Sequence, residues 1–143
     1  MSAARPLRIA VVAGEESGDL LGADIIRVLR ADGCDVELRG VGGRHLEELG
    51  LKSLFDAQEV ALMGLSAIFR DLPRLLRRIS HTAREIAAWK PDCLITIDSP
   101  DFCLRVVRAA RAARADLPTV HYVAPTVWAW RPGRAAKMAP FID

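Results

Sequence analysis

Short apolar runs alternate with segments of helical periodicity along the chain. The runs at 8–13 and 93–98 are apolar almost throughout, which is typical of strands buried on both faces of a sheet. Between them lie segments whose apolar side chains recur on one side of a helix. The predicted strands are 8–13, 36–41, 51–55, 93–98 and 119–123. The predicted helices are 19–30, 45–49, 65–89 with a break at 71–73, 101–115 and 131–139.

This alternation of strands and helices predicts an α/β fold, a Rossmann-like parallel sheet with helices on both faces. Right-handed crossovers then bring every strand-to-helix loop to one edge of the sheet. That carboxyl edge is where open α/β sheets bind their ligands. The loops expected there are 14–19, 41–44, 98–101 and 124–131.

The composition places the chain among ordinary globular domains. Its 143 residues suffice for one domain with a real core, and 51% of them are hydrophobic and 27% charged. A net charge of +2 argues against a dedicated nucleic-acid binder. The N-terminus lacks the apolar core of a signal peptide, and the sequence has no run of about 18 apolar residues that would span a membrane. Residues 140–143 resemble the start of another strand, so we expect the chain to be the N-terminal part of a longer protein.

The three cysteines are Cys34, Cys93 and Cys103, and their spacing is not that of a metal site. Two of them lie in or beside apolar runs. We therefore expect small buried hydrophobic side chains in a reducing cytoplasm rather than disulfides or metal ligands.

The most informative segment is 94–102, in which a predicted strand runs directly into Asp98. A buried parallel strand delivers its last side chain to the carboxyl edge, so Asp98 is a carboxylate held at a candidate site by a rigid element. Two alternatives stay open. Asp98 could simply cap the loop, or it could hold magnesium as in a Walker B strand, although the chain has no Walker A sequence. Asp101 is expected to be the N-cap of the next helix or an orienting residue.

The loop 14–19 joins the first strand to the first helix. Its glycines would let the backbone approach a ligand, and the helix N-terminus behind it attracts anions. It is neither a P-loop nor a GxGxxG fingerprint, and its acids suit sugar hydroxyls better than a bare phosphate. The alternative is a capping turn with Ser17 or Asp19 as N-cap. The candidate substrate-binding residues of this loop are Gly14, Glu15, Ser17, Gly18 and Asp19.

The segment 121–131 carries two of the three tryptophans, Trp128 and Trp130, in what the topology makes a loop. Exposed tryptophan is unfavourable, so this loop should pack on a neighbouring domain, a subunit or a ligand, and indoles stack well on sugar rings. His121, at the strand end, either faces the site or is a structural histidine.

The predicted helix at 65–89 has apolar residues on about a third of its circumference and basic residues opposite. This pattern predicts a helix packed on the sheet with a solvated basic face. Residues 60–65, which include Met63, are more apolar than one stripe needs, and with the arginines they could instead rest on an anionic bilayer or receive acyl chains. The apolar stripe is Leu65, Ile68, Phe69, Leu72, Leu75, Leu76, Ile79, Ala83 and Ile86. The basic face is Arg70, Arg74, Arg77, Arg78, His81 and Arg84.

Five motifs together resemble the N-terminal half of the lipid-A-disaccharide synthases, a family of inverting glycosyltransferases of the GT-B type. The resemblance covers nearly the whole chain, and the last two motifs are highly specific. The motifs are VVAGEESGD at 11–19, GVGG at 40–43, LMG at 62–64, IDSPDF at 97–102 and HYVAPTVWAWR at 121–131.

The resemblance implies transfer of 2,3-diacylglucosamine from UDP-2,3-diacylglucosamine to 2,3-diacylglucosamine 1-phosphate (lipid X), with inversion and with no cofactor or metal. Asp98 matches the proposed general base of the family. The loop 14–19, Met63, His121 and Trp128 would bind substrate. The enzyme would be cytoplasmic and peripherally associated with the inner membrane, because both substrates carry acyl chains; it would not bind nucleic acid, and a homo-oligomer is left open.

The resemblance also implies that residues 1–143 are the N-terminal, acceptor-side Rossmann-like domain, inactive alone because the C-terminal nucleotide-binding domain is absent from this chain. Two other classes compete. One is another GT-B enzyme such as a nucleotide-sugar 2-epimerase. The apolar segment around Met63 argues against this class, because it favours a lipid substrate. The other is a non-catalytic flavodoxin-like binding module. The carboxylates in two loops at one edge of the sheet argue against this class, because they favour an enzyme.

Overall fold

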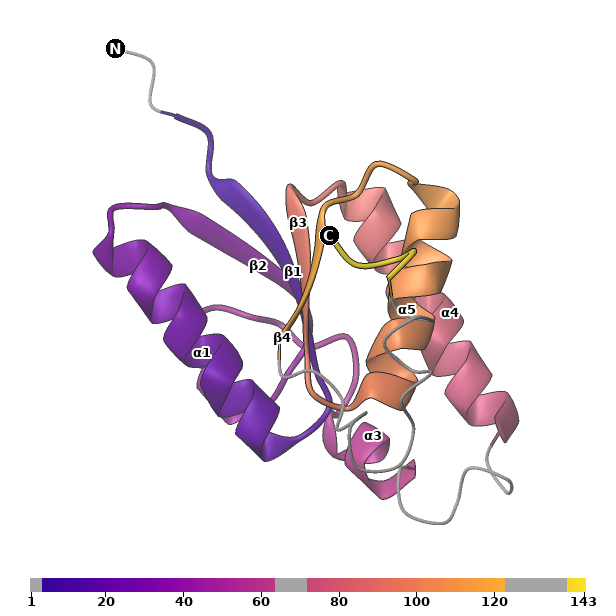
Figure 1. The fold of residues 1–143 in the computed structure, drawn as a ribbon. Coiled ribbons are helices and arrows are strands. Elements are labelled where there is room, and N and C mark those ends of the chain that lie inside the picture. The colour runs from indigo at the N-terminus through magenta and orange to yellow at the C-terminus, as the bar shows by residue number, and fades with distance from the viewer. Residues whose placement is uncertain (1–3, 64–71, 123–138) are drawn as a thin grey trace.

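The computed structural model describes residues 4–63, 72–122 and 139–143. Its centre is a four-stranded parallel sheet in the order β2-β1-β3-β4 (Figure 1). The strands are β1 (Leu7–Ala13), β2 (Val36–Val41), β3 (Cys93–Ile97) and β4 (Thr119–Tyr122). The helices are α1 (Glu16–Ala31), α2 (Arg44–Glu47), α3 (Gln58–Met63), α4 (Leu72–Trp89) and α5 (Pro100–Ala113). The predicted α/β fold with a parallel sheet is confirmed.

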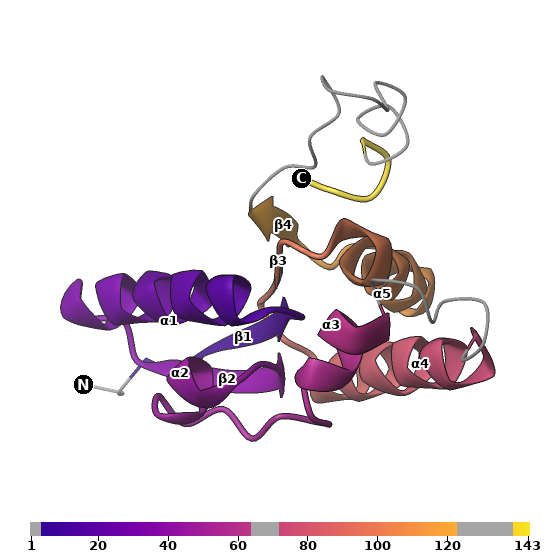
Figure 2. The ribbon, with the colours of Figure 1, turned by 90° about the horizontal axis from the view of Figure 1, so that it is seen from below.

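The central strands β1 and β3 are buried on both faces of the sheet. Successive strand residues point in opposite directions, so Ile9 and Val11 of β1 pack in the core under α1, whereas Ala10 and Val12 pack against α4 and α5. Figures 1 and 2 show α1 on one side of the sheet and α4 and α5 on the other. Burial on both faces is the reason why the central strands β1 and β3 are largely apolar without alternation, whereas the edge strands β2 and β4 keep exposed positions. The helices on both faces confirm the prediction.

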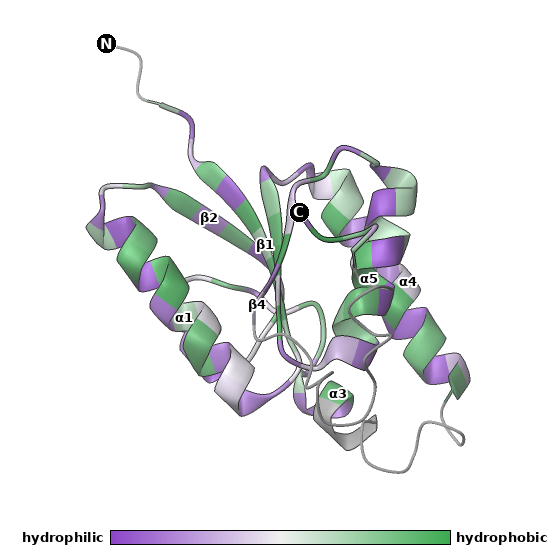
Figure 3. Cartoon of the chain, in the orientation of Figure 1, coloured by the Kyte–Doolittle hydropathy of each residue, from purple (hydrophilic) through white to green (hydrophobic). Residues whose placement is uncertain are grey.

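Helix α4 buries only part of the predicted apolar stripe. Leu75, Ile79 and Ile86 are buried, whereas Leu72 and Leu76 are 40% and 48% exposed. The exposed pair lies near the start of the helix, which projects away from the sheet in Figure 1. Both hydrophobic and hydrophilic residues colour α1, α4 and α5 in Figure 3, as expected of helices with one buried side. Among the residues that the structure describes, no helix is both long enough and apolar enough to cross a bilayer.

Sequence reasoning did not predict α3, and α4 holds it in place. The Glu59 carboxylate of α3 accepts hydrogen bonds from Arg74 and Arg78, each at 3.0 Å. The Arg78 guanidinium also lies 4.9 Å from the ring centre of Phe55. The predicted solvated basic face is confirmed for Arg74, Arg77 and Arg84, which are exposed, while Arg78 is half-buried between Glu59 and Phe55.

Several predicted boundaries differ from the observed ones. Helix α1 begins at Glu16 and not at 19, because the Asp19 N–H already donates to the Glu15 carbonyl at 2.9 Å. Strand β3 ends one residue before the predicted end, and α5 begins one residue before its predicted start. Residues 65–71 and 131–138, both predicted to be helical, lie outside the described residues.

The predicted strand at 51–55 is wrong, since it makes a single bridge, from Ser53 to Gly40, within the described part of the chain. Gly40 has a φ of +141°, and a Cβ added to it would lie 1.9 Å from the carbonyl oxygen of Val11. Only glycine allows β2 to approach β1 this closely. The predicted strand start at 140–143 is wrong as well, because residues 139–141 form a turn.

Candidate functional site at the carboxyl edge

Three of the four predicted loops meet at the carboxyl edge of the sheet, and the fourth, 124–131, lies outside the described residues. Gly14, in the loop between β1 and α1, packs between α3 and the turn that follows β3. A Cβ added to Gly14 would lie 2.6 Å from Val60 Cγ1 and 2.8 Å from Ser99 Oγ. Glycine is thus required here by neighbouring side chains, which is a different reason from the ligand approach that the sequence suggested.

Asp19 joins the β1–α1 loop to the β2–α2 loop. Its side chain is 3% exposed, and its Oδ1 accepts hydrogen bonds from the backbone N–H of Gly43 at 2.8 Å and of Leu46 at 3.1 Å. Its Oδ2 accepts one from the His45 N–H at 2.8 Å. The expectation that Asp19 or Ser17 caps α1 is wrong, because Glu15 is the N-cap residue and makes no side-chain cap bond. Asp19 instead satisfies N–H groups at the start of α2, which have no partner within that helix.

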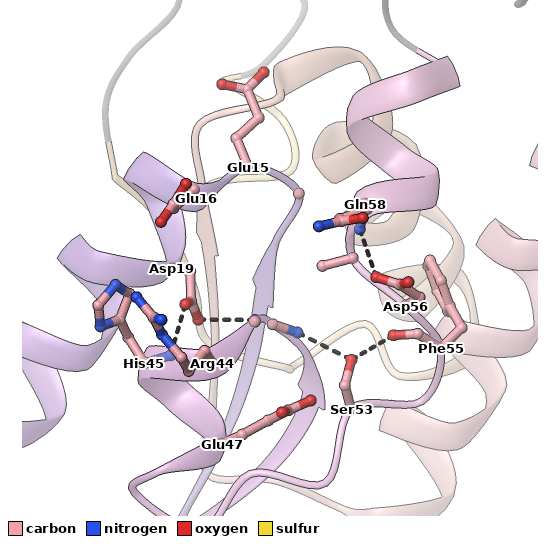
Figure 4. A pocket seen from close by; sticks show the side chains of 14 residues that line it. Glu15, Glu16, Asp19, Arg44, His45, Glu47, Ser53, Phe55, Asp56 and Gln58 are labelled. Carbon is pink, nitrogen blue, oxygen red and sulfur yellow. Dashed lines mark hydrogen bonds between the residues drawn. The ribbon is translucent and has the colours of Figure 1, made fainter.

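A pocket of about 810 Å³ opens beside this junction (Figure 4). Glu15 and Glu16 stand on one side of it, and Asp56 and Gln58 stand across from them. The remaining polar lining comes from Asp19 of α1, from α2 and from Ser53 in the segment before α3. The lining residues are Gly14, Glu15, Glu16, Asp19, Gly42, Gly43, Arg44, His45, Glu47, Ser53, Phe55, Asp56, Ala57 and Gln58.

The wall of the pocket opposite α1 is held by local hydrogen bonds. Ser53 Oγ donates to the Phe55 carbonyl at 2.6 Å and accepts from the Gly42 N–H at 3.2 Å. Asp56 Oδ1 accepts from the Gln58 N–H at 3.0 Å. Carboxylates outnumber cationic groups in the lining, so the pocket suits hydroxyl groups that donate hydrogen bonds and disfavours a bare phosphate.

Asp98 lies at the same edge, outside the lining of this pocket. Its backbone N–H donates to the Tyr122 carbonyl of β4 at 3.0 Å, and its side chain is half-buried. Asp98 and Ser99 both have positive φ, +52° and +39°, so they form a tight left-handed turn between β3 and α5. Asp101 is not the N-cap, because α5 begins at Pro100 with Ser99 in the cap position. The carboxylate that the sequence singled out thus belongs to the turn and not to the strand.

His121 pairs with a residue that sequence reasoning missed. Thr96 of β3 lies opposite it in the parallel register, and Thr96 Oγ1 is 2.8 Å from His121 Nδ1. Within the described residues, His121 Nε2 is buried without a hydrogen-bond partner. Burial lowers the pKa of His121, and the negative charge of Asp98 opposes that shift. A lone threonine inside an otherwise apolar strand was the available signal for Thr96.

The cysteines have no partner among themselves. Cys103 is fully buried, and burial raises the pKa of its thiol to about 12, so it is protonated and unreactive. Cys34 and Cys93 are half-buried, and all three are free. The expected small buried hydrophobic role is confirmed for Cys103 and holds only in part for the other two.

The other residues predicted to bind substrate do not line the pocket in the described part of the chain. Ser17 is exposed, and neither it nor Gly18 lines the pocket. A Cβ on Gly18 would lie 3.3 Å from the Ile97 carbonyl oxygen, so this glycine lets α1 approach β3 closely. Met63 ends α3 and its side chain is not described, while Trp128 lies outside the described residues. Substrate binding by any of these residues stays a prediction.

The parallel sheet, the helices on both faces and the polar pocket at the carboxyl edge define a Rossmann-like α/β domain. A sequence model of the family described as lipid-A-disaccharide synthetase matches residues 9–143. The chain therefore belongs to the lipid-A-disaccharide synthetase family, as its motifs predicted.

Curated relatives agree with this assignment over almost the whole chain. A lipid-A-disaccharide synthase of Ruegeria pomeroyi is 51% identical over 141 residues, which are 99% of this chain and 35% of the relative. One of Rhodospirillum centenum is 49% identical over 140 residues, 97% of this chain and 35% of the relative. One of Xanthomonas euvesicatoria is 48% identical over 140 residues, 98% of this chain and 31% of the relative. The chain spans about a third of the length of these relatives.

Proposed function

We propose that this chain is the N-terminal, acceptor-side domain of an inverting GT-B glycosyltransferase that forms the lipid A disaccharide. The donor is UDP-2,3-diacylglucosamine and the acceptor is 2,3-diacylglucosamine 1-phosphate. Family membership supports the activity, and the half-buried Asp98 at the carboxyl edge of a parallel sheet is the observation that carries the chemistry. The nucleotide-binding domain lies outside these 143 residues in this proposal.

The reaction is one displacement at the anomeric carbon of the donor. The Asp98 carboxylate takes the proton of the acceptor 6-hydroxyl while the hydroxyl oxygen bonds to the anomeric carbon. The bond from that carbon to the UDP oxygen breaks on the opposite face, UDP leaves with the electron pair, and the configuration inverts. Donors and a helix N-terminus of the second domain would stabilise the charge on UDP.

The pocket beside Gly14 is the proposed place for the sugar ring of the acceptor. Gly14 touches Ser99, so the pocket adjoins the turn that carries Asp98. Carboxylates such as Glu15 and Glu47 accept hydrogen bonds from sugar hydroxyls, and the same charges would keep the 1-phosphate out of this pocket.

Replacement of Asp98 by asparagine tests the proposed base. The change is nearly isosteric and removes only the proton acceptor, so Asp98→Asn in the full-length enzyme should lower kcat by roughly 10²–10⁴-fold with little loss of stability. Asp101→Asn is the comparison variant and should act more weakly. A radiolabelled-acceptor assay measures both, and a near-normal kcat for Asp98→Asn would exclude Asp98 as the base.

We also place the apolar segment around Met63 and the start of α4 against acyl chains or the inner membrane. The exposure of Leu72 and Leu76 beside a basic face supports this. Serine at Met63, Leu65 and Phe69 should raise KM for lipid substrates and reduce binding to anionic vesicles. The control is serine at Val28, an exposed residue on the opposite side of the sheet. A triple variant that unfolds in a thermal melt would show that the three residues belong to the core.

The isolated chain should not form disaccharide. Transfer requires the donor to be held in line with the acceptor hydroxyl, and a misplacement of about 1 Å can cost about 10²-fold. The same radiolabelled assay on residues 1–143, with and without the remaining part of the enzyme added in trans, measures this. Turnover well above background by the chain alone would contradict the two-domain proposal.

A further inference from the structure

The turn between β3 and α5 has an unfavourable backbone conformation. Asp98 and Ser99 are consecutive non-glycine residues with φ of +52° and +39°. Side chains with a Cβ are disfavoured in this left-handed region, and serine tolerates it less well than aspartate. Ser99 also precedes Pro100, whose ring disfavours helical backbone angles in the residue before it. Such conformations persist only where the surrounding structure holds them, and they cluster at functional sites.

Three neighbouring elements hold this turn. The Asp98 N–H donates to the Tyr122 carbonyl of β4 at 3.0 Å. The Ser99 carbonyl accepts from the Cys103 N–H of α5 at 2.9 Å. The Ser99 side chain abuts Gly14 so closely that a Cβ on Gly14 would lie 3.2 Å from Ser99 Cβ. The backbone that carries Asp98 is thus constrained from the sheet, from the helix and from the pocket loop at once.

We infer that Ser99 is a positioning residue for the reaction, because its side chain locks the left-handed turn that holds the Asp98 carboxylate in place. The inference rests on the proposed function, in which Asp98 is the general base. Pro100 removes part of the backbone conformations open to the residue before it, and the contact with Gly14 restricts a side chain at this position further. A glycine could adopt the same turn without strain, but it could also adopt many others. The base would then lose its fixed position while the binding pocket stays intact.

The test compares two replacements of Ser99 in the full-length enzyme. Ser99→Gly should lower kcat by about 10-fold or more, with KM for the acceptor close to that of the wild type. Ser99→Ala loses Oγ but keeps the Cβ and its contact with Gly14, so its loss of kcat should be clearly smaller. Because glycine relieves the strain, the melting temperature of Ser99→Gly should be at or above that of Ser99→Ala.

The chain offers a matched control in Lys90, which also has a left-handed backbone, with φ of +54°. Lys90 is exposed and lies between α4 and β3, at the opposite edge of the sheet. Lys90→Gly relieves the same kind of strain, so its melting temperature should not fall and its kcat should equal that of the wild type.

Each remaining outcome separates the two proposals. A normal kcat for Ser99→Gly together with a large loss for Asp98→Asn would keep Asp98 as the base and overturn the role of Ser99. Equal losses of kcat in Ser99→Ala and Ser99→Gly would assign the effect to the hydroxyl and would also overturn the role of Ser99. A melting temperature of Ser99→Gly below that of Ser99→Ala would overturn this role as well. A normal kcat for Asp98→Asn would remove the proposed base, and the role of Ser99 with it.

Discussion

The hydrogen bonds of Asp19 predict how much its replacement by asparagine lowers the free energy of unfolding. Asp19→Asn keeps the size of the side chain but replaces one carboxylate oxygen with an amide nitrogen. The remaining oxygen can still accept from Gly43 and Leu46. The new NH₂ group would face the His45 N–H, which now donates to Oδ2 at 2.8 Å, so two donors would meet at a buried position.

The magnitude follows from these bonds. Loss of one hydrogen bond to a charged acceptor is worth about 1.5–3 kcal/mol, and the two surviving bonds weaken because the acceptor is no longer charged. We therefore expect Asp19→Asn to lower the free energy of unfolding by about 2–4 kcal/mol. The matched control is Asp24→Asn on the same helix, whose carboxylate is exposed and pairs with Arg27 at 3.0 Å. Breaking that pair should cost less than about 0.5 kcal/mol.

The assay is urea unfolding of the full-length enzyme, followed by circular dichroism, with KM for the acceptor measured on the same samples. Asp19→Asn should shift the first unfolding transition to lower urea, while Asp24→Asn should not. If the two variants are equally stable, the three bonds of Asp19 do not hold the two loops together. A rise in KM for Asp19→Asn at unchanged stability would make Asp19 a substrate ligand instead of a structural cap.

Two further predictions concern the ends of the sheet. Gly40→Ala should destabilise the protein by at least ~2 kcal/mol in the same urea assay, since the new Cβ would meet the Val11 carbonyl oxygen. Gly33→Ala has positive φ but open space around it, so it should cost less. The hydrogen bond from Arg5 holds the pKa of Asp92 below its ordinary value of 3.8. The small contribution of this pair to the free energy of unfolding is therefore present above pH 3.8 and is lost as the pH falls through the lower pKa of the folded state. Asp92→Asn should flatten the dependence of the free energy of unfolding on pH in this range. An unchanged slope would contradict the pairing.

The fold class could be predicted from the sequence because both faces of the central strands β1 and β3 are buried. A strand that is covered on both faces is apolar at almost every position, so the runs at 8–13 and 93–98 are visible without any knowledge of the fold. Parallel pairing then follows from the helices between the strands, and it places loops 14–19 and 98–101 at one edge. The position of Asp98 at that edge is therefore a property of the local pattern.

The roles of individual side chains could be assigned only from the tertiary structure. Asp19 looked like a ligand-binding or capping residue of its own helix, but its oxygens accept from N–H groups more than 20 residues away. Helix α3 is tied to α4 by Glu59, which pairs with two arginines of that helix, and such a long-range contact is not visible in the local sequence pattern. Local periodicity reports which face of an element is buried, whereas hydrogen bonds, close glycine contacts and the left-handed turn at Ser99 depend on which distant residues the fold brings alongside. That is why the sequence determined the sheet and its edge, and only the tertiary structure decided how the residues at that edge are held.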